Sequence, residues 1–496
     1  MKIKNLALTA IATLAVVSCS SHPGGITETV DRDLIPGVSI VYSANIDGEI
    51  EPCGCRSNPT GGVNRRWNFV QQKVPGEKLI IDSGDLFFQS APVPPFLEKQ
   101  WNYQAHVLLT AYNALGVEAM TPGDLDFADG LAPFEKLAKE AKFKIVSANL
   151  YYKNSGKRMF APYVILNKGG KKVAIFGLFD EVLPLPPEIF AKDHFEAATE
   201  MVQELRGRAD IILALTHEGI DHDMELAKKV TGIDGIFGAH TQSFLMSPEK
   251  IGDTLIFQPS FRGQHIGVYV NGTNSMFQID DRFDSKPDNL NILDKVVADG
   301  KAEIARINKE TDAELMGTAG PRKTEKPTGH EIAFQTFTQC AQCHTAQYAF
   351  YKSTSHFKSF ATLVQAKQAA NLDCLKCHTV GAQQPGGWTG VNKLVLNGAG
   401  HPIDAASFVK SLPNMDMQAL GKISKAFVNV QCETCHKAGG GHPMGGATLL
   451  TKAIDSSTCV QCHTPDRAPG WYKNGKLDAE LVQAKLKSVS CPRIRN

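Results

Sequence analysis

The sequence has no internal apolar run that approaches the roughly 20 residues of a membrane-spanning helix, and it carries almost no net charge. Lysine and arginine together number 52, against 51 aspartates and glutamates, so the formal net charge is +1. This balance excludes a strong electrostatic field for nucleic acid or for an anionic membrane surface. The remaining composition, 43% hydrophobic and 21% charged, is typical of a folded globular protein. At 496 residues the chain is too long for one ordinary core, so we expect two or three domains.

Residues 1–19 have the pattern of an export signal. Lys2 and Lys4 form a positive region, residues 6–17 are mostly apolar, and a small residue precedes Cys19. The pattern resembles a bacterial lipoprotein signal, which implies that Cys19 becomes the lipidated first residue of the mature chain. An ordinary cleaved signal with an incidental cysteine is the alternative. Both interpretations predict an exported protein. Lipidation adds attachment to the bacterial membrane, at the outer membrane or the periplasmic face.

Short apolar runs alternate with amphipathic stretches from residue 38 to residue 282, after a segment at 20–37 that we interpret as a tether. This alternation predicts an α/β sandwich of two mixed sheets flanked by helices. Residues 283–329 predict a helical linker, because apolar residues recur there at helical spacing among alternating charges. Helices are also expected at 102–116 and 131–142. The strand candidates are 38–44, 78–82, 144–150, 171–179, 210–217, 234–240, 253–258 and 265–272.

Residues 330–496 contain four C-x-x-C-H motifs. Such a motif brings together two thiols, which add across the vinyl groups of haem, and an imidazole, which binds the iron. A zinc or thiol redox site is the alternative, but neither explains the histidine after every motif. We therefore predict a mainly helical, loop-rich domain with four covalent c-type haems. The attachment residues are Cys340, Cys343, Cys374, Cys377, Cys432, Cys435, Cys459 and Cys462, and the proximal iron ligands are His344, His378, His436 and His463.

Four other histidines in this region equal the number of haems, which matches a second histidine ligand at every iron without assigning one, and a five-coordinate haem remains the alternative. Two histidine ligands lower the reduction potential relative to a Met/His pair. The histidines are His330, His356, His401 and His442, and the competing axial ligands are Met415, Met417 and Met444.

Three segments, 340–361, 374–388 and 429–443, resemble the tetrahaem cytochromes related to the electron carrier of hydroxylamine-oxidising nitrifiers. The resemblance implies that His356 and His442 are distal ligands, and it assigns no role to His330 or His401. It also implies that closely stacked haems pass electrons one at a time.

Segments of the first half resemble the periplasmic 5′-nucleotidase branch of the calcineurin-like metallophosphatases. The resemblance implies a site in which carboxylates and imidazoles hold two metal ions, one aspartate bridges them, and bound hydroxide attacks phosphorus. Family nucleotidases continue into a nucleotide-specificity domain, and here the C-x-x-C-H region takes its place. The matching segments are 42–55, 80–87, 120–131, 213–220 and 235–243.

The implied metal site departs from the family pattern. Asn45-Ile46-Asp47 stands where the family has Asp-x-His, Gly123-Asp124-Leu125-Asp126 stands for Gly-Asn-His-[Asp/Glu], and Gln242 replaces a histidine. Loss of the acid at Leu125 costs about 10²–10⁴-fold in rate. One ion is expected on Asp85, Asp124, His217 and His240. A second ion would have only Asn45, Asp47, Asp85 and Gln242, a set that suits Mg²⁺ or Ca²⁺.

Cys53 and Cys55 follow the first of these loops and are expected near the mouth of the metal site. A turn with one cysteine in a disulfide, for example to Cys491, a redox-active pair supplied with electrons by the haems, and a metal-binding pair all remain open.

The sequence thus predicts an exported tetrahaem lipoprotein that transfers electrons to or from other redox proteins. The degenerate metallophosphatase-like domain would serve as scaffold or redox-linked site, with at most one divalent metal ion. The alternative is a haem-coupled hydrolase, with Asp85 and Asp124 catalytic, or a reductase of an oxyanion or sulfur compound. A structural subunit of a surface cytochrome assembly is a third class. No nucleic-acid partner is expected.

Overall fold

The computed structural model describes most of the first half of the chain and the haem-motif segments of the second. No described helix is both long and apolar enough to cross a membrane. Several predicted features lie outside the described residues, namely Cys19, Cys53, Cys55, His330, His401, Met415, Met417 and Met444. The described residues are 26–30, 32–52, 59–318, 334–366, 368–369, 371–382, 387, 427–440, 442, 450–451, 454–465, 467–473 and 476–492.

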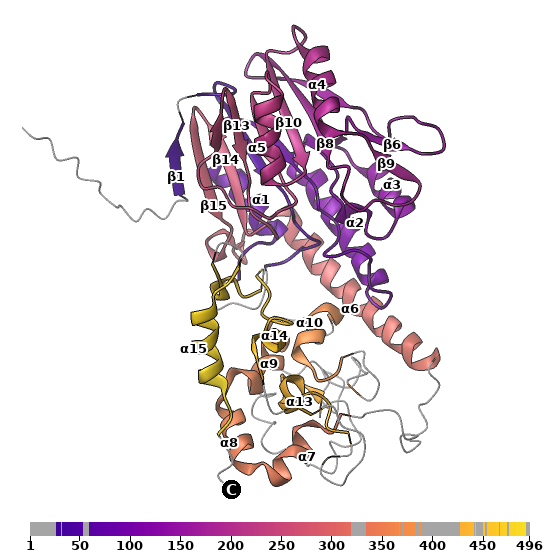
Figure 1. Cartoon of the computed structure of the whole chain (residues 1–496), viewed down its shortest axis with the longest axis vertical. Helices are drawn as coiled ribbons and strands as arrows, with labels where there is room; N and C mark the ends of the chain where they lie inside the picture. The colour runs from indigo at the N-terminus through magenta and orange to yellow at the C-terminus, as the bar shows by residue number, and fades with distance from the viewer. Residues whose placement is uncertain are drawn as a thin grey trace, which may run out of the picture.

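Two mixed sheets form the first half of the molecule (Figure 1). The seven-stranded sheet has the order β1 (Ile26–Thr29), β15 (Thr273–Gln278), β14 (His265–Val270), β2 (Val38–Ser43), β3 (Glu77–Asp82), β4 (Ala119–Met120) and β5 (Lys144–Ile145). The six-stranded sheet has the order β12 (Glu249–Ile251), β13 (Thr254–Phe257), β11 (Gly235–Gly238), β10 (Ile211–His217), β8 (Lys171–Phe179) and β7 (Tyr163–Lys168). A small ribbon pairs β6 (Leu150–Tyr152) with β9 (Ile189–Ala191).

The two sheets pack face to face through side chains with no solvent exposure. Ile40 and Leu79 of one sheet share a cluster with Leu213 and Phe257 of the other. Strand β8 is apolar and buried from Val173 onward, as expected of a strand covered on both faces. The strands β2-β3-β4-β5 and β8-β10-β11-β13 are parallel neighbours. Their carboxyl ends therefore meet at one edge of each sheet.

Helices cover the outer faces of both sheets. The helices α4 (His194–Leu205) and α5 (Ile220–Lys229) lie on the six-stranded sheet, and α1 (Val63–Lys73), α2 (Glu98–Leu115) and α3 (Leu131–Glu140) lie on the other. Local sequence sets their ends. Gly116, with φ of 75°, ends α2 in the left-handed conformation that glycine adopts without strain. The Asp193 carboxylate accepts the Glu196 N–H and caps α4.

The long helix α6 (Ile292–Thr318) lies between the two halves and packs on α1 and α2 (Figure 1). It buries Leu293, Val297 and Ile304, so it belongs to the core of the first half. It lies within the predicted helical linker, residues 283–329.

The second half contains short helices, and each C-x-x-C-H motif begins in or forms one of them (Figure 1). Phe360 and Leu375 are buried in the same cluster as residues of α1 and α2, so one apolar core reaches into both halves. A ribbon of β16 (Tyr472–Lys473) and β17 (Lys476–Leu477) precedes the last helix. The helices are α7 (Thr336–Cys343), α8 (Thr345–Ser353), α9 (Ser359–Gln365), α10 (Leu372–His378), α13 (Cys432–His436), α14 (Ser456–Cys459) and α15 (Ala479–Val489).

The tether prediction is wrong at residues 26–29. These residues form β1, which pairs antiparallel with β15 through Ile26↔Met276 and Thr29↔Thr273. The predicted helices at 102–116 and 131–142 are confirmed as α2 and α3. All eight strand candidates contain a strand, although 144–150 is divided between β5 and β6.

Candidate functional site

Four side chains with metal-binding groups converge where parallel strands end. Asp85 follows β3, Asp124 follows β4, His217 is the last residue of β10, and His240 follows β11. The carboxyl ends of parallel strands are the usual place for a ligand in open α/β sheets. The two sheets therefore bring together residues that are up to 155 positions apart, from Asp85 to His240.

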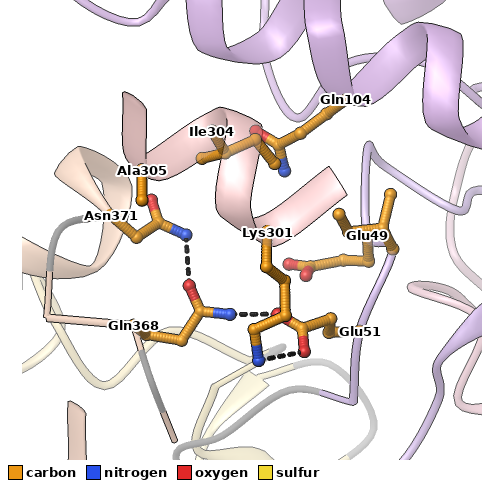
Figure 2. A pocket seen from close by; sticks show the side chains of 9 residues that line it. Glu49, Glu51, Gln104, Lys301, Ile304, Ala305, Gln368 and Asn371 are labelled. Carbon is orange, nitrogen blue, oxygen red and sulfur yellow. Dashed lines mark hydrogen bonds and ion pairs between the residues drawn. The ribbon is translucent and has the colours of Figure 1, made fainter. Parts of the chain in front are cut away.

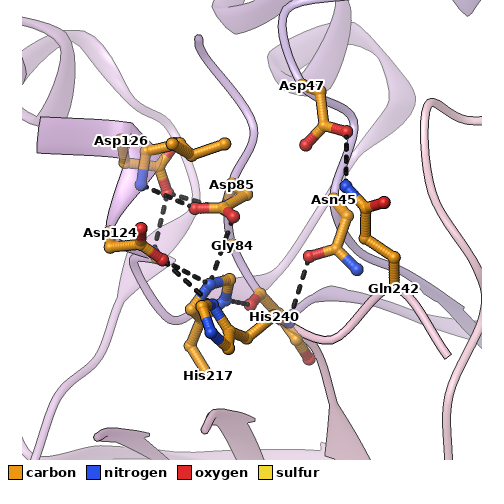
Figure 3. Close-up of polar contacts among 12 residues, drawn as sticks. Asn45, Asp47, Gly84, Asp85, Asp124, Asp126, His217, His240 and Gln242 are labelled. Atoms are coloured by element: carbon orange, nitrogen blue, oxygen red, sulfur yellow. Dashed lines mark hydrogen bonds and ion pairs between the residues drawn. The ribbon is translucent and has the colours of Figure 1, made fainter. Parts of the chain in front are cut away.

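One carboxylate and one imidazole stand at the centre of this group (Figure 3). His217 Nε2 lies 3.2 Å from Asp85 Oδ2 and 3.2 Å from Asp124 Oδ1. His240 Nδ1 lies 3.2 Å from the same Asp124 oxygen. One potential ligand atom from each of the four residues lies within 4.8 Å of the others. Oxygen and imidazole donors at this spacing are able to hold one divalent transition-metal ion.

Backbone groups fix the orientation of the two central residues. His217 Nδ1 lies 2.8 Å from the Ser83 carbonyl oxygen, so this nitrogen donates its proton and Nε2 faces the carboxylates. Asp85 Oδ1 accepts the Leu125 N–H. The neighbouring Asp126 is a structural residue and not a metal ligand, because its carboxylate already accepts four backbone N–H groups. They belong to Asp85, Leu86, Phe87 and Gly123.

The charges of the group are arranged to receive a cation. Burial raises the pKa of Asp124, but the hydrogen bonds and charges of His217 and His240 outweigh it and hold that pKa below its usual range. Burial alone lowers the pKa of His217, and the carboxylates of Asp85 and Asp124 more than reverse this, so it lies well above the usual value. A metal ion held by Nε2 would take the place of that proton, so its binding would release one proton.

The backbone of the site is strained at several positions. Asn45, Asp47, Asp85, His240 and Gln242 all have positive φ values, between 51° and 78°. Residues with a side chain adopt this conformation rarely, and it costs of order 1–3 kcal/mol each. Strain of this kind clusters at functional sites. The five positions are all among the residues predicted for the two-ion site.

The second half of the predicted two-ion site is closed by internal hydrogen bonds. Asn45 Oδ1 accepts the His240 N–H, and its Nδ2 donates to the Ser260 carbonyl. Gln242 Nε2 donates to Asp47 Oδ2 at 3.3 Å. In Figure 3 these residues lie beside the four-residue group and not within it. Of the predicted carboxylate and histidine ligands, the structure thus gathers Asp85, Asp124, His217 and His240 and leaves out Asp47. Asn45 and Gln242 are engaged in the hydrogen bonds above.

A guanidinium group lies beside Asp47, where the sequence predicted ligands for a second ion. Arg262 Nε lies 4.0 Å from Asp47 Oδ2, and its Nη1 pairs with Glu49 Oε1. The backbone N–H of Arg262 also donates to the Asn45 carbonyl oxygen. The fixed positive charge compensates Asp47 without a metal. Sequence reasoning missed Arg262, because it matches no motif and only the fold brings it here.

The haem motifs present their histidines in a form suited to iron. His378 Nδ1 lies 2.7 Å from the Ser359 carbonyl oxygen, and His436 Nδ1 lies 2.8 Å from the Thr451 carbonyl oxygen. A nitrogen held in this way carries the proton, which leaves Nε2 as the neutral ligand atom. The residues present therefore fit a c-type haem at both motifs.

Two pairs of histidine rings lie close together in the second half. The imidazole centroids of His344 and His442 are 6.3 Å apart, and those of His356 and His463 are 6.2 Å apart. Each metal–nitrogen bond to a histidine is about 2 Å long, so either gap has room for a single metal ion bonded to both rings. His356 and His442 are the two predicted distal ligands that lie within the described residues.

The motifs themselves lie in adjacent pairs. The thiols of Cys340 and Cys432 lie close to each other, which brings the first motif next to the third. The thiols of Cys377 and Cys462 likewise lie close to each other, which brings the second motif next to the fourth. Haems on adjacent motifs would be close neighbours, as electron exchange requires.

Polar contacts fix the second motif against the first half of the chain (Figure 2). Lys301 of α6 donates to Glu51 at 2.5 Å and also to the Ala366 carbonyl. Gln368 donates to the same Glu51 carboxylate. These side chains line a small pocket between the halves, with Gln104, Ile304 and Asn371. The second motif begins only three residues after Asn371 in the sequence, so this contact places one haem position near the first domain.

Comparison with curated proteins shows similarity to nucleotide phosphoesterases in the first half. The chain is 30% identical over 297 residues to the trifunctional nucleotide phosphoesterase YfkN of Bacillus subtilis, covering 48% of this chain and 20% of the relative. It is 31% identical over 216 residues to human 5′-nucleotidase, covering 39% and 34%. The chain thus spans less than two thirds of the length of these relatives.

The family described as "Cytochrome c554 and c-prime" matches residues 339–400, which contain the first two haem motifs. Among solved structures, a 5′-nucleotidase precursor from Thermus thermophilus aligns with a TM-score of 0.47 at 21% identity, over 54% of this chain and 59% of that one. The chain contains a 5′-nucleotidase-like, calcineurin-like phosphoesterase domain with a metallophosphatase-like α/β fold, and a cytochrome-like region follows it.

Proposed function

We propose that this chain is an exported, lipid-anchored electron-transfer protein with four covalent c-type haems. The observation that carries the proposal is the pairing of His344 with His442 and of His356 with His463, at 6.3 and 6.2 Å between ring centroids. Two imidazoles on opposite sides of one iron leave no open position for a substrate. Such a centre exchanges electrons and does not bind or activate small molecules.

The chain's own residues would hold the haems through the motif cysteines and the four motif histidines. Bound haem supplies a one-electron Fe(III)/Fe(II) couple. The carbonyls of Ser359 and Thr451 keep His378 and His436 in the tautomer that binds iron through Nε2. Contacts between the first and third motifs, and between the second and fourth, support transfer within two haem pairs. We propose other redox proteins as partners, with Cys19 as the anchor to the membrane.

We propose further that the first domain binds one divalent ion and has lost efficient phosphoester hydrolysis. Asp85, Asp124, His217 and His240 supply one complete ligand set, whereas Arg262 replaces the second cation. In a two-metal mechanism one ion activates the attacking oxygen and the other stabilises the leaving oxygen. A single ion cannot stabilise both of these oxygens. Leu125 also stands in place of the histidine that would serve the leaving group, so the general acid is absent as well.

The distal-ligand assignment is tested on the haem-loaded protein by spectroscopy. We expect His442→Ala and His356→Ala each to convert one haem per chain from six-coordinate low-spin to five-coordinate high-spin, as read by electron paramagnetic resonance. His106→Ala is the matched control, because His106 lies on α2 with a partly exposed side chain paired to Glu140. Spectra of the two variants that equal the wild-type spectrum would contradict the assignment.

A metal-dependent phosphoester hydrolase is the second candidate, favoured by the intact four-residue group around Asp124. The purified protein is supplied with Mn²⁺, Mg²⁺ or Zn²⁺ and with nucleotide and aryl phosphates. Our proposal predicts no turnover above that of Asp85→Ala. Turnover that Asp85→Ala abolishes would establish the hydrolase and would leave electron transfer as only part of the function.

A further inference from the structure

A second group of metal-binding side chains lies on the six-stranded sheet, apart from the four-residue site. Asp180 directly follows β8 and Glu218 directly follows β10. The parallel register Phe179↔His217 places these two carboxylates side by side at the strand ends. His194 begins α4 and His222 lies in the first turn of α5, so both helices direct an imidazole to the same place.

Two hydrogen-bond acceptors face each other inside this group. His194 Nδ1 lies 2.7 Å from Glu181 Oε2, so this nitrogen donates its proton and Nε2 keeps a lone pair. His194 Nε2 lies 4.0 Å from Glu218 Oε2, and the two side chains are 2% and 0% exposed. Neither this nitrogen nor either oxygen of Glu218 has a hydrogen-bond partner. A distance of 4.0 Å is too long for a direct hydrogen bond, so the pair is left unsatisfied.

The negative charge of the group has little compensation. Among the described residues, the ion pairs of Asp180 and Glu181 are with His222 and His194, and no lysine or arginine pairs with them. The Asp180–His222 contact is 2.7 Å long, and the imidazoles of His194 and His222 stack at 5.2 Å. A buried carboxylate without a cation or donor is costly, and proteins meet this cost by pairing it, by binding a metal or by keeping it protonated. Burial, together with the charges of Asp223, Asp180 and Glu181, raises the pKa of Glu218 well above its usual range.

The nearby Asp223 differs from Glu218 in this respect. Its two oxygens accept from Thr216 Oγ1 at 2.5 Å and from Gln258 Nε2 at 2.6 Å. Asp223 is therefore satisfied by the protein, while the Glu218 carboxylate beside it is not. Of these two carboxyl groups, only that of Glu218 has no hydroxyl or amide donor, and its closest polar neighbour is the carboxyl of Asp223.

We propose that this group binds a divalent transition-metal ion of the Zn²⁺ or Mn²⁺ type, between His194 Nε2 and the Glu218 carboxylate, with Asp180 as third ligand. The 4.0 Å gap suits two ligands on opposite sides of an octahedral Mn²⁺ ion, and a tetrahedral Zn²⁺ ion would draw the two atoms closer together. Ligand atoms of Asp180, Glu181 and His194 lie within 4.8 Å of one another. Glu181 holds the outer nitrogen of His194, the usual carboxylate–histidine–metal arrangement. The partly exposed His222 and Glu181, at 38% and 31%, give an ion access from solvent.

The ion would connect the ends of β8 and β10 with the start of α4. Because Glu218 directly follows His217, it would also hold the strand end that carries the first site. The two sites use different ligands, so each is tested separately. The inference does not depend on the haems or on the proposed electron-transfer function.

The test counts non-haem metal per chain in the full-length, haem-loaded protein. After chelation, reloading with Zn²⁺ or Mn²⁺ and dialysis, plasma mass spectrometry is expected to find two ions in the wild type. One ion is expected in Glu218→Gln, one in Asp124→Asn, and none in the double variant. Glu225→Gln is the matched control, because Glu225 lies on α5 but pairs with Lys229 at the surface. It is expected to retain two ions.

A second measurement separates ligand loss from misfolding. In the Asp124→Asn background, Zn²⁺ at about 100 times its Kd is expected to raise the Tm by roughly 5–10 °C. The same addition is expected to leave the Tm of Asp124→Asn/His194→Gln unchanged. Equal metal content in Glu218→Gln and wild type, or no Zn²⁺-dependent Tm rise in Asp124→Asn, would overturn the proposal. A chain with a single ion that Glu218→Gln loses would support this site and count against the first.

Discussion

The two halves of this molecule are built on different physical principles. In the first half, side chains such as Ile40, Leu213 and Phe257 fill the space between two sheets and are fully buried. In the described part of the second half, short helices of four to eleven residues surround the haem motifs. Isolated helices of this length are marginal in water, so their stability must come from packing. We infer that the haems supply much of that packing, whereas the first half folds on its own side chains.

The largest expected effect therefore comes from removing a haem. In Cys374→Ala/Cys377→Ala, the second motif loses its thioether attachments, and we expect cleavage of the second half to become at least about tenfold faster. Residues 26–318, which include all strands of both large sheets, are expected to survive as the resistant part. Limited proteolysis followed by mass spectrometry measures both halves in one sample. Cys491→Ala, an exposed cysteine outside the motifs, is the control. Equal resistance of the two halves in the variant would remove the contrast between them.

The second-largest effect is expected on metal affinity, where Asp124 and Asp47 should behave differently. Asp124→Asn removes the carboxylate between two imidazoles, and we expect Mn²⁺ affinity to fall beyond the roughly 10–100-fold lost with an outer-shell partner. Asp47→Asn, on the side held by Arg262, is expected to change the affinity only a few-fold. Calorimetric titration in the Glu218→Gln background isolates this site. A comparable loss in both variants would show that Asp47 is a ligand after all.

A smaller effect is expected from Gly123, which lies against Asp85 and His217. A Cβ on Gly123 would lie 2.2 Å from Asp85 Oδ1 and 2.5 Å from His217 Cε1. Gly123→Ala should therefore displace both side chains and lower the free energy of unfolding by about 1–3 kcal/mol. Denaturant unfolding measures the change, with Gly470→Ala, whose added Cβ meets nothing, as the control. A variant of unchanged stability would mean that the loop shifts without cost.

The pH dependence of stability gives the last contrast. Burial raises the pKa of Asp82 to about 6, although Ser43, Arg66 and Tyr112 all oppose this shift. Because the folded state then holds the proton more tightly than the unfolded state, stability should fall as the pH rises from about 4 to 6 and stay level above. The shift corresponds to roughly 2–3 kcal/mol. We expect Asp82→Asn to remove this fall, and urea unfolding at several pH values tests it. An identical pH profile in the variant would exclude Asp82 as the cause.

Much of the first half could be predicted from sequence, because buried parallel strands contain continuous apolar runs such as 173–179 and 211–215. The strand β7, which is half-buried and ends in Asn167 and Lys168, lacked that signal and was missed. So was β1, whose polar residues show their pairing only through β15. Local pattern could not indicate these partners, since they lie far away in the sequence.

The candidate sites show the same limit. The motifs predicted Asp85, Asp124, His217 and His240 as one ligand set, and the structure places these four together. The same motifs could not show that Arg262 lies beside Asp47, or that Glu218 faces His194. These contacts join loops and helix ends whose proximity is set by the sheets. The positive φ values of the site residues would have been a signal, but backbone conformation at non-glycine residues is not readable from sequence.

The most direct test of the account is a reductive titration of the full-length, haem-loaded protein, followed by visible spectroscopy under anaerobic conditions. We predict uptake of four electrons per chain, one for each C-x-x-C-H motif. We also predict complete reoxidation by a one-electron acceptor without any added phosphoester. Uptake of fewer than four electrons, or a requirement for a phosphoester in the reoxidation step, would contradict the claim that this chain is an electron-transfer protein.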